Sequence, residues 1–315
     1  MQFFKKFDAL GTGIELWLDS NQTRDSVNDL ETIEKQVVEF EKTFSRFLEE
    51  SELSQLNKTD GQFKASSEMM VLLKLAKDFY KRTDGLFDPT VARPLEKLGY
   101  NKSFHTLGEL SSEKESSEPD DLRNDVDFEK VVIDDQNSTV SIPSNIKIDL
   151  GGIGKGYIVD ILAKQLVEWG YENFWISAGG DMFLSGQKDG KSHQVGVQNP
   201  LKHDEDLLDI EVRDNHLAVA TSGTTKRHWS KEGKIWHHII DPQTGLSAEN
   251  DLLAVTVVCT NIIEADVFAK VAFVLGKEKG LDFINKQKNV EGLIIDKDLN
   301  VILSREMSDY LIQND

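Results

Sequence analysis

The chain has 315 residues, of which 39% are hydrophobic and 29% charged, and its formal net charge is -19 at pH 7. This composition is typical of a globular protein with a sizeable core, and the acidic excess argues against nucleic-acid binding, which requires a basic surface. A single cysteine excludes an internal disulfide, and no apolar run is long enough to insert stably into a membrane or to serve as an export signal, so we expect a cytoplasmic protein.

The first 130 residues predict a hairpin, two helices and a loop. Loose alternation of apolar residues predicts a hairpin or bulged strand over 3–18. Apolar residues three and four apart predict a long amphipathic helix over 26–50 and a second over about 67–83, which stops at the turn Asp84-Gly85. Residues 108–127 are acidic and rich in serine, so we expect a mobile loop there within a single unit, 1–315.

Residues 146–157, the central motif, are the stretch around which the chain is organised. They read I-K-I-D-L-G-G-I-G-K-G-Y, which is the order strand, glycine-rich loop, helix. Glycines let backbone N–H groups approach a ligand, and a helix N-terminus attracts phosphate. The spacing G-x-G-x-G matches neither the dinucleotide fingerprint G-x-G-x-x-G nor the Walker loop G-x-x-x-x-G-K-[ST] of nucleoside triphosphatases. A phosphate site and a plain strand-to-helix turn therefore both remain open.

A second glycine turn follows about thirty residues later. The helix after the central motif ends at Gly170, and a strand over 173–176 leads into Ser177–Asp181, which reads S-A-G-G-D. Two glycine turns that each follow a strand can face one ligand from two sides. Further strands are expected at 131–133, 139–142, 195–197, 208–212, 254–260, 292–295 and 301–303.

The last predicted helix, 262–275, is apolar nearly all round and should be buried. Asn261 followed by Glu264 is a capping-box pattern at its start. Asp266 and Lys270 are four residues apart and lie on one face of this helix, where the simplest interpretation is an ion pair.

Two adjacent histidines, His237 and His238, lie in the stretch 235–245. Neighbouring residues of a strand point to opposite faces, so the two rings cannot both line one pocket. This disfavours a metal site made of both histidines.

Several of these stretches together resemble the FAD:protein FMN transferases, the ApbE family. The central motif resembles that family's D-L-G-G-I-A-K-G-Y, residues 177–181 its N-A-G-G-D, and residues 238–245 its H-I-I-D-P-x-T-G. Further matching blocks lie at 45–57 (S-R-F…S-E-L-S-x-L-N), 85–100 (G-x-F-D-P-T…P-L) and 218–223 (A-x-A-T-S-G). The resemblance extends from about Phe7 to about Ser304 and departs from the family where Leu10 replaces a Met and Lys270 a Thr.

The resemblance implies a fold and an activity. The fold is α+β, T-fold-like, with two closely packed lobes of mainly antiparallel sheet and helices and a cofactor cleft between them. The activity moves FMN from the substrate FAD to a Thr or Ser hydroxyl of an acceptor flavoprotein, with release of AMP and assistance from Mg²⁺. The acceptor would carry a D-x-x-T-[SG]-A-T-like motif, which this chain lacks.

The resemblance also implies roles for particular residues. His238 would be the catalytic base, because its side chain titrates in the right range. Gly152, Asp266 and position 270 would hold Mg²⁺. Contacts with FAD are implied for Leu10, Phe87, Asp88, Asp149, Lys155, Ala178, Gly179, Gly180, Asp181, Ser222 and Ile239.

Lys270 raises a question about the Mg²⁺ site and leaves three functions open for the protein. A protonated lysine cannot ligate Mg²⁺, so either its ammonium group replaces the metal, or it turns away and Mg²⁺ binds with a water in the missing place. The alternatives to FMN transfer are hydrolysis of FAD to FMN and AMP, and flavin binding without catalysis.

Overall fold

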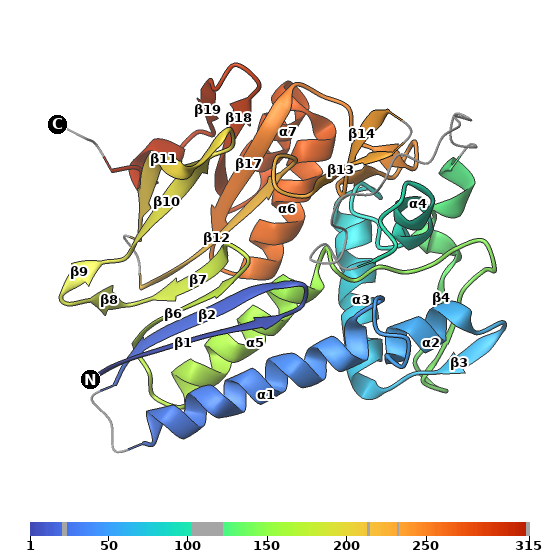
Figure 1. Cartoon of the computed structure of the whole chain (residues 1–315), viewed down its shortest axis with the longest axis horizontal. Helices are drawn as coiled ribbons and strands as arrows, with labels where there is room; N and C mark the ends of the chain where they lie inside the picture. Colours follow the sequence, from blue (N-terminus) through green and yellow to red (C-terminus); the bar gives the residue numbers. More distant parts are fainter. Residues whose placement is uncertain (21–23, 103–121, 213–214, 232, 313–315) are drawn as a thin grey trace. The chain divides into compact units, whose positions relative to one another are not determined.

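The computed structural model describes residues 1–20, 24–102, 122–212, 215–231 and 233–312 (Figure 1). The chain divides into two compact units. Unit 1 consists of Met1–Val38, Lys155–Thr225 and Asn250–Asp315, and unit 2 of Glu39–Gly154 and Lys226–Glu249.

Unit 1 is built on an eight-stranded sheet in which every neighbouring pair is antiparallel. Its order is β1-β2-β6-β7-β12-β17-β18-β19. The mainly antiparallel arrangement expected for the fold is thus confirmed. The bounds of the strands are β1 Gln2–Ala9, β2 Thr12–Asp19, β6 Asn173–Ala178, β7 Asp181–Ser185, β12 His216–Gly223, β17 Leu252–Cys259, β18 Glu291–Asp296 and β19 Val301–Leu303.

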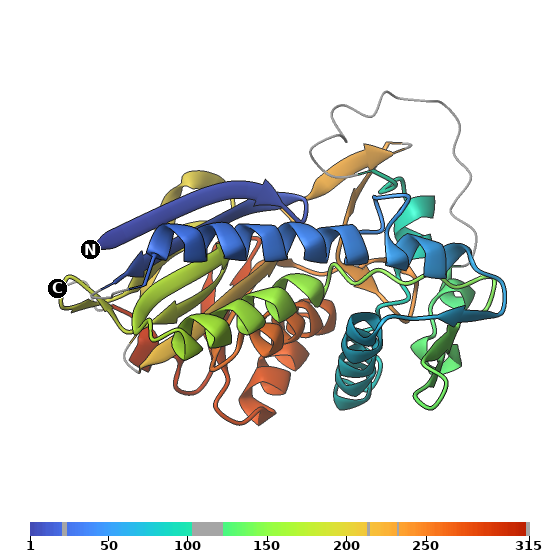
Figure 2. The same ribbon diagram turned by 90° about the horizontal axis from the view of Figure 1, so that it is seen from below.

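Helices α5 (Gly154–Glu168), α6 (Ile262–Leu275) and α7 (Lys277–Lys286) belong to this unit, and α6 packs on β12 and β17. Helix α1 (Ser26–Phe44) lies beside α5 (Figure 2), where the side-chain amides of Gln36 and Gln165 bond to each other. A cluster of buried apolar side chains, including Leu184, Val197, Ile210 and Met307, packs the sheet against hairpin β10–β11 and the 3-10 helix η4. The other elements of unit 1 are β8 Gln187–Lys188, β9 Lys191–Ser192, β10 Gln194–Asn199, β11 Lys202–Glu211 and η4 Met307–Tyr310.

Unit 2 contains the 16-residue helix α3, several shorter helices, a three-stranded antiparallel sheet in the order β3-β5-β4, and two small hairpins. Its core includes the stacked rings of Tyr100 and Trp229 together with Leu95, Leu98 and Trp236. The elements are α2 Glu52–Lys58, β3 Gln62–Lys64, α3 Ser67–Arg82, α4 Ala92–Lys97, η2 Arg123–Asp125, η3 Phe128–Lys130, β4 Val132–Asp134, β5 Thr139–Ser141, β13 His228–Lys231, β14 Lys234–His237, β15 Ile240–Asp241 and β16 Leu246–Ser247.

Most predicted elements are present, but the long first helix was predicted six residues too long. Helix α1 ends at Phe44, because Ser51 ties the following turn together: its hydroxyl donates to the carbonyl of Ser45 at 2.6 Å and accepts from the N–H of Ser54 at 3.0 Å, which starts α2. The strand expected at 208–212 is the end of a longer strand, β11.

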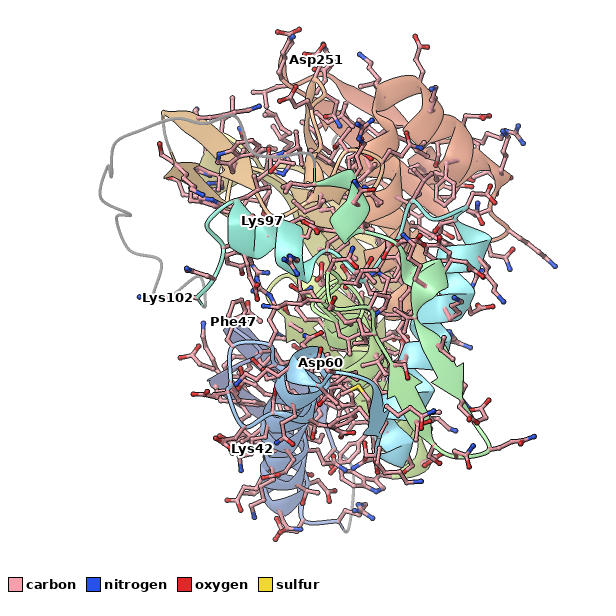
Figure 3. The ribbon with its side chains drawn as sticks, turned by 90° about the vertical axis from the view of Figure 1, so that its right-hand side faces the viewer. Lys42, Phe47, Asp60, Lys97, Lys102 and Asp251 are labelled. Carbon is pink, nitrogen blue, oxygen red and sulfur yellow. The ribbon has the colours of Figure 1, made fainter. Side chains whose placement is uncertain are left out.

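The acidic segment expected to be mobile, 108–127, lies mostly outside the described residues. Lys102 is the last residue described before the gap (Figure 3). Residues 122–127 are described and include η2, with Leu122 and Asp125 buried and Asp125 paired to Lys97. No helix in the described parts of the chain combines the length and the apolar character that crossing a membrane requires.

Candidate active site

Two hairpin turns of unit 1 lie side by side. Leu10 and Gly11 form the two-residue loop between β1 and β2, and Gly179 and Gly180 form the loop between β6 and β7. All four residues have positive φ, which is typical of the tight hairpin turn. The N–H of Gly179 donates to the carbonyl of Gly13 at 3.0 Å, and a Cβ at Gly179 would lie 2.4 Å from the hydroxyl of Thr12. The second turn therefore requires glycine to pack on the first.

Four charged side chains of unit 1, which we call the charge cluster, meet beside the second turn: Lys155, Asp181, Asp266 and Lys270. Lys155 Nζ bonds Asp181 Oδ2 and lies 3.7 Å from Asp266 Oδ2, while Lys270 Nζ bonds Asp266 Oδ1. Asp181 Oδ1 also accepts the N–H of Thr221 at 3.2 Å. The ion pair between Asp266 and Lys270, expected from their spacing, is present and joins a wider network.

The two carboxylates of the charge cluster lie deeper than the two ammonium groups. The side chains of Asp266 and Asp181 are 3% and 8% exposed, whereas those of Lys155 and Lys270 are 12% and 19% exposed. Burial lowers the pKa of Lys270, and the charge of Asp266 opposes that shift. The cluster has two positive and two negative groups, so its formal charge is zero.

Helix α6 is held in place at its N-terminus by two acceptors. Asn261 Oδ1 accepts the N–H of Glu264 at 2.9 Å, which confirms the predicted cap. Asp160 of α5 accepts the N–H groups of Ile262 and Ile263 at 3.0 and 3.1 Å. Burial raises the pKa of Asp160 to about 6. Asp160 was not among the predicted residues, although a carboxylate within an apolar helical stretch was a usable signal.

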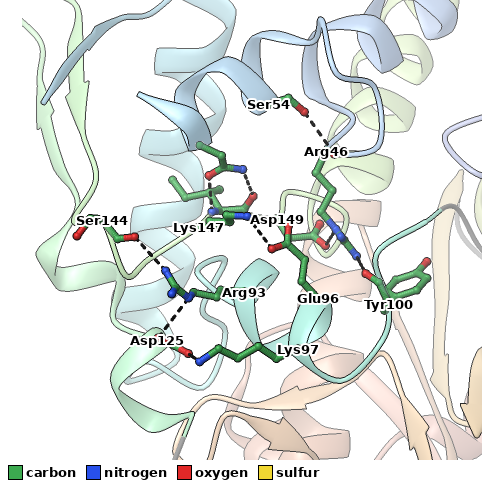
Figure 4. Close-up of polar contacts among 12 residues, drawn as sticks. Arg46, Ser54, Arg93, Glu96, Lys97, Tyr100, Asp125, Ser144, Lys147 and Asp149 are labelled. Atoms are coloured by element: carbon green, nitrogen blue, oxygen red, sulfur yellow. Dashed lines mark hydrogen bonds and ion pairs between the residues drawn. The ribbon is translucent and has the colours of Figure 1, made fainter. Parts of the chain in front are cut away.

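In unit 2 the glycine loop of the central motif is anchored by Arg46 (Figure 4). Asp149 Oδ2 accepts Arg46 Nε at 2.7 Å, and Asp149 Oδ1 accepts the N–H of Gly151 at 2.6 Å. Arg46 also donates to the carbonyl of Tyr100 at 2.9 Å and lies against the ring of Phe47. The carboxylate of Asp149 thereby shapes the loop. Arg46, for which no role was predicted from the sequence, holds that carboxylate.

Another residue of the 45–57 block performs a similar task. The side chain of Asn57 donates to the carbonyl of Ile148 at 2.8 Å and accepts its N–H at 2.7 Å. The block S-R-F…L-N thus positions both residues that precede Leu150.

Asp88 and Phe87 are buried within unit 2. Asp88 Oδ1 accepts the N–H of Thr90 at 2.7 Å and also bonds the hydroxyl of Thr90, and Asp88 Oδ2 accepts the N–H of Phe128 at 3.1 Å. Burial raises the pKa of Asp88, and these hydrogen bonds oppose the rise. Phe87 packs edge to face against Phe79. Both side chains are engaged with the protein, and their role toward FAD stays a prediction.

The two adjacent histidines differ in their surroundings. His237 Nε2 lies 3.0 Å from the carbonyl of Ala248, and its Nδ1 accepts the N–H of Ile239 at 3.3 Å, so a neutral ring satisfies both contacts. Burial correspondingly lowers the pKa of His237. His238 Nδ1 lies 3.4 Å from the carbonyl of Arg227, an arrangement that favours a proton on Nδ1 and leaves Nε2 as an acceptor. The assignment of the catalytic base to His238 stays a prediction.

The remaining predicted positions fall into two groups. Ala178, Ser222 and Ile239 are buried, at 0%, 5% and 4% exposure, whereas Gly180 is exposed and a Cβ there would meet no atom within 4 Å. Gly152 lies in the turn of the central motif and is partly exposed. Leu10, Gly179 and the charge cluster come together in unit 1, while Phe87, Asp88, Asp149, Gly152, His238 and Ile239 belong to unit 2.

The charge cluster does not fit a divalent metal ion. Asp266 Oδ1 already carries the ammonium of Lys270, and Oδ2 faces Lys155. A dication about 4 Å from the Lys270 ammonium on Asp266 would be repelled by it by roughly 8 kcal/mol at an effective dielectric constant of about 20. Among the described residues, no group of three or more His, Cys, Asp or Glu side chains is arranged to hold a metal.

The chain is similar in both sequence and structure to a class of known proteins. The chain is 26% identical over 290 residues, 89% of its own length and 82% of the other's, to the FAD:protein FMN transferase of Haemophilus influenzae. It is 30% identical over 177 residues to that of Klebsiella pneumoniae strain 342, of which it spans about half, 54%. The crystal structure of the ApbE protein of Thermotoga maritima superposes with a TM-score of 0.87 at 30% identity, covering 99% of this chain and 100% of that one.

These similarities define an α+β protein with the architecture of the flavin-transferase class. The model of the ApbE family matches residues 10–294. The chain belongs to the ApbE family.

Proposed function

We propose that this protein transfers FMN from FAD to a Thr or Ser hydroxyl of an acceptor flavoprotein and releases AMP. The observation that carries the proposal is the extent of the family match, since residues 10–294 include every position given a role here. Relatives that bear the name FAD:protein FMN transferase align with up to 89% of the chain.

In the proposed reaction His238 accepts the proton of the acceptor hydroxyl through Nε2. The hydroxyl oxygen forms a bond to the FMN-side phosphorus of FAD, and the bond from that phosphorus to the bridging oxygen breaks. AMP leaves with the electron pair of that bond, and the proton passes from His238 to the AMP phosphate or to water. A base is required because a hydroxyl is a poor nucleophile at neutral pH.

Other residues bind and orient FAD in this proposal. Lys155 follows the first residue of α5, so its ammonium and the helix N-terminus favour the same anionic groups. Asp149 keeps the glycine loop in shape through Gly151. Leu10 and Gly180, at the two hairpin turns, offer an apolar side chain and an open backbone surface to the ligand.

The proposed reaction has no step that uses Mg²⁺, because the charge cluster does not fit a divalent metal ion. The acceptor is proposed to carry a D-x-x-T-[SG]-A-T-like motif, and the cytoplasmic location stays a prediction.

The test is incubation of the purified protein with FAD and an acceptor domain that carries this motif, with intact-mass spectrometry of the acceptor. Addition of FMN to the acceptor and appearance of AMP are expected. His238→Gln should slow the transfer by about 10²- to 10⁴-fold and leave FAD binding intact, whereas exchange of the exposed His203 for Gln, the matched control, should change neither.

Two other outcomes would contradict FMN transfer. Release of FMN and AMP into solution with an unmodified acceptor would identify hydrolysis. A stable complex with intact FAD would identify a flavin-binding protein.

A further inference from the structure

Helix α6 carries its own cation at the place where the family resemblance implies a metal ligand. Lys270 Nζ bonds Asp266 Oδ1 and also lies 3.3 Å from the backbone carbonyl of Asp266. The ammonium group thus contacts oxygen donors of the kind that a hard metal ion would select.

Burial distinguishes this pair from an ordinary ion pair on a helix. Helix α7 has the same arrangement, Asp282 followed four residues later by Lys286, with Nζ and Oδ2 at 2.6 Å. There both side chains lie in solvent, 62% and 71% exposed, and such a pair contributes little. Asp266 is 3% exposed and needs a permanent counter-charge, because a buried carboxylate without one is strongly unfavourable.

The position of the cation also fits an anionic ligand. The ammonium groups of Lys155 and Lys270 are the more exposed members of the charge cluster, and their carboxylate partners lie beneath them. Lys155 is in the first turn of α5, where the partial positive charge of the helix adds to that of the side chains. Gly180, where a Cβ would meet no atom within 4 Å, directly precedes Asp181, the carboxylate that bonds Lys155.

We propose that Lys270, held on Asp266, replaces the divalent cation in this protein and neutralises the pyrophosphate of FAD, so that FAD binds without metal. The inference rests on the proposed function for the identity of the ligand, and it concerns which cation binds that ligand. With Thr in place of Lys270 the formal charge of the cluster would be -1, and a dication could then bind at Asp266.

The first measurement is FAD binding, without any acceptor, by quenching of flavin fluorescence in EDTA and in Mg²⁺. The wild type should bind FAD equally in both. Lys270→Thr should bind FAD about 10- to 100-fold more weakly in EDTA, through loss of one charge-assisted contact, and should regain affinity in Mg²⁺. Lys270→Arg keeps a cation and should remain insensitive to EDTA, and Lys286→Thr is the matched control that should behave as the wild type.

The second measurement is metal binding itself, with Mn²⁺ as the probe and its free-ion resonance signal as the readout. Lys270→Thr should bind one Mn²⁺ per chain, displaced by Mg²⁺, at least about 100-fold more tightly than the wild type or Lys286→Thr. Thermal melting of each variant separates a loss of folding from a loss of binding, and the gain of a metal site by Lys270→Thr can arise only from folded protein.

The results separate this inference from the proposed function. One Mn²⁺ bound by the wild type, FAD binding that needs Mg²⁺, or unaltered FAD and Mn²⁺ binding in Lys270→Thr would each overturn the inference, whether or not FMN transfer occurs. Absence of FMN transfer together with metal-independent, Lys270-dependent FAD binding would overturn the proposed function and support the inference.

Discussion

Gly156, the last glycine of the central motif, offers a direct test of how α5 and α6 are joined. A Cβ at this position would lie 2.8 Å from Ile263 Cα and 3.1 Å from both Ile262 O and Ile263 N. All three are backbone atoms at the start of α6, so no side-chain rotation can relieve the overlap. We interpret this glycine as a requirement of close helix packing and not as part of a phosphate cradle.

Gly156→Ala should therefore destabilise the protein by about 2 kcal/mol. Overpacking of this kind costs about 1–3 kcal/mol, with a rigid backbone neighbour at the upper end, and the better helix propensity of Ala returns up to about 1 kcal/mol. The melting temperature should fall by about 3 °C for a chain of this length. Separation of the helices would also draw Lys155 away from Asp266, now 3.7 Å apart, so FAD binding should weaken as well.

The assays are urea unfolding, thermal melting and FAD titration, with Gly154→Ala as the matched control in the same helix turn. A Cβ at Gly154 would meet only the ring of Phe40, at 3.5 Å, an ordinary contact. That variant should be as stable as the wild type or more stable. Equal stabilities of Gly156→Ala and Gly154→Ala would refute the packing argument.

Two further predictions concern Asp160 and Leu10. Burial raises the pKa of Asp160 to about 6, so between pH 4 and 6 the folded chain holds a proton that the unfolded chain has lost. The contribution of this group to the free energy of unfolding therefore falls by about 3 kcal/mol as the pH rises through that window. Urea titrations should show the wild type losing that amount relative to Asp160→Asn, and a difference that does not depend on pH would contradict the assignment. Leu10 has a φ of 57°, a backbone conformation that is strained for Leu and tolerated by Asn. Leu10→Asn should therefore raise the free energy of unfolding by about 0.5–1 kcal/mol, measured by urea unfolding. It should also weaken FAD binding, measured by titration, and undiminished FAD affinity would count against a contact between Leu10 and the flavin.

The sequence by itself determined the local structure of this protein. The all-round apolar pattern of 262–275 and the capping residue Asn261 predicted α6 with its correct start, and the glycine pair 179–180 marked a tight turn. Such features depend on residues up to four positions apart, which a linear pattern contains. Where the pattern continued past a local stop, as beyond Phe44, the prediction failed, because Ser51 ends the run through hydrogen bonds that periodicity does not reveal.

Only the tertiary structure decided which charged groups meet. Arg46 and Asp149 are 103 positions apart, and Asp160 and Ile262 are 102 apart, yet each pair is in direct contact. The sequence identified Asp149, Lys155, Asp181, Asp266 and Lys270 as candidates, but it left open whether Lys270 points toward Asp266 or away from it. Packing of strands and helices that are distant in the chain determines which charged groups are buried beside each other. A buried charge that is shielded from water is stable only with such a partner, so these pairs form only in the folded protein.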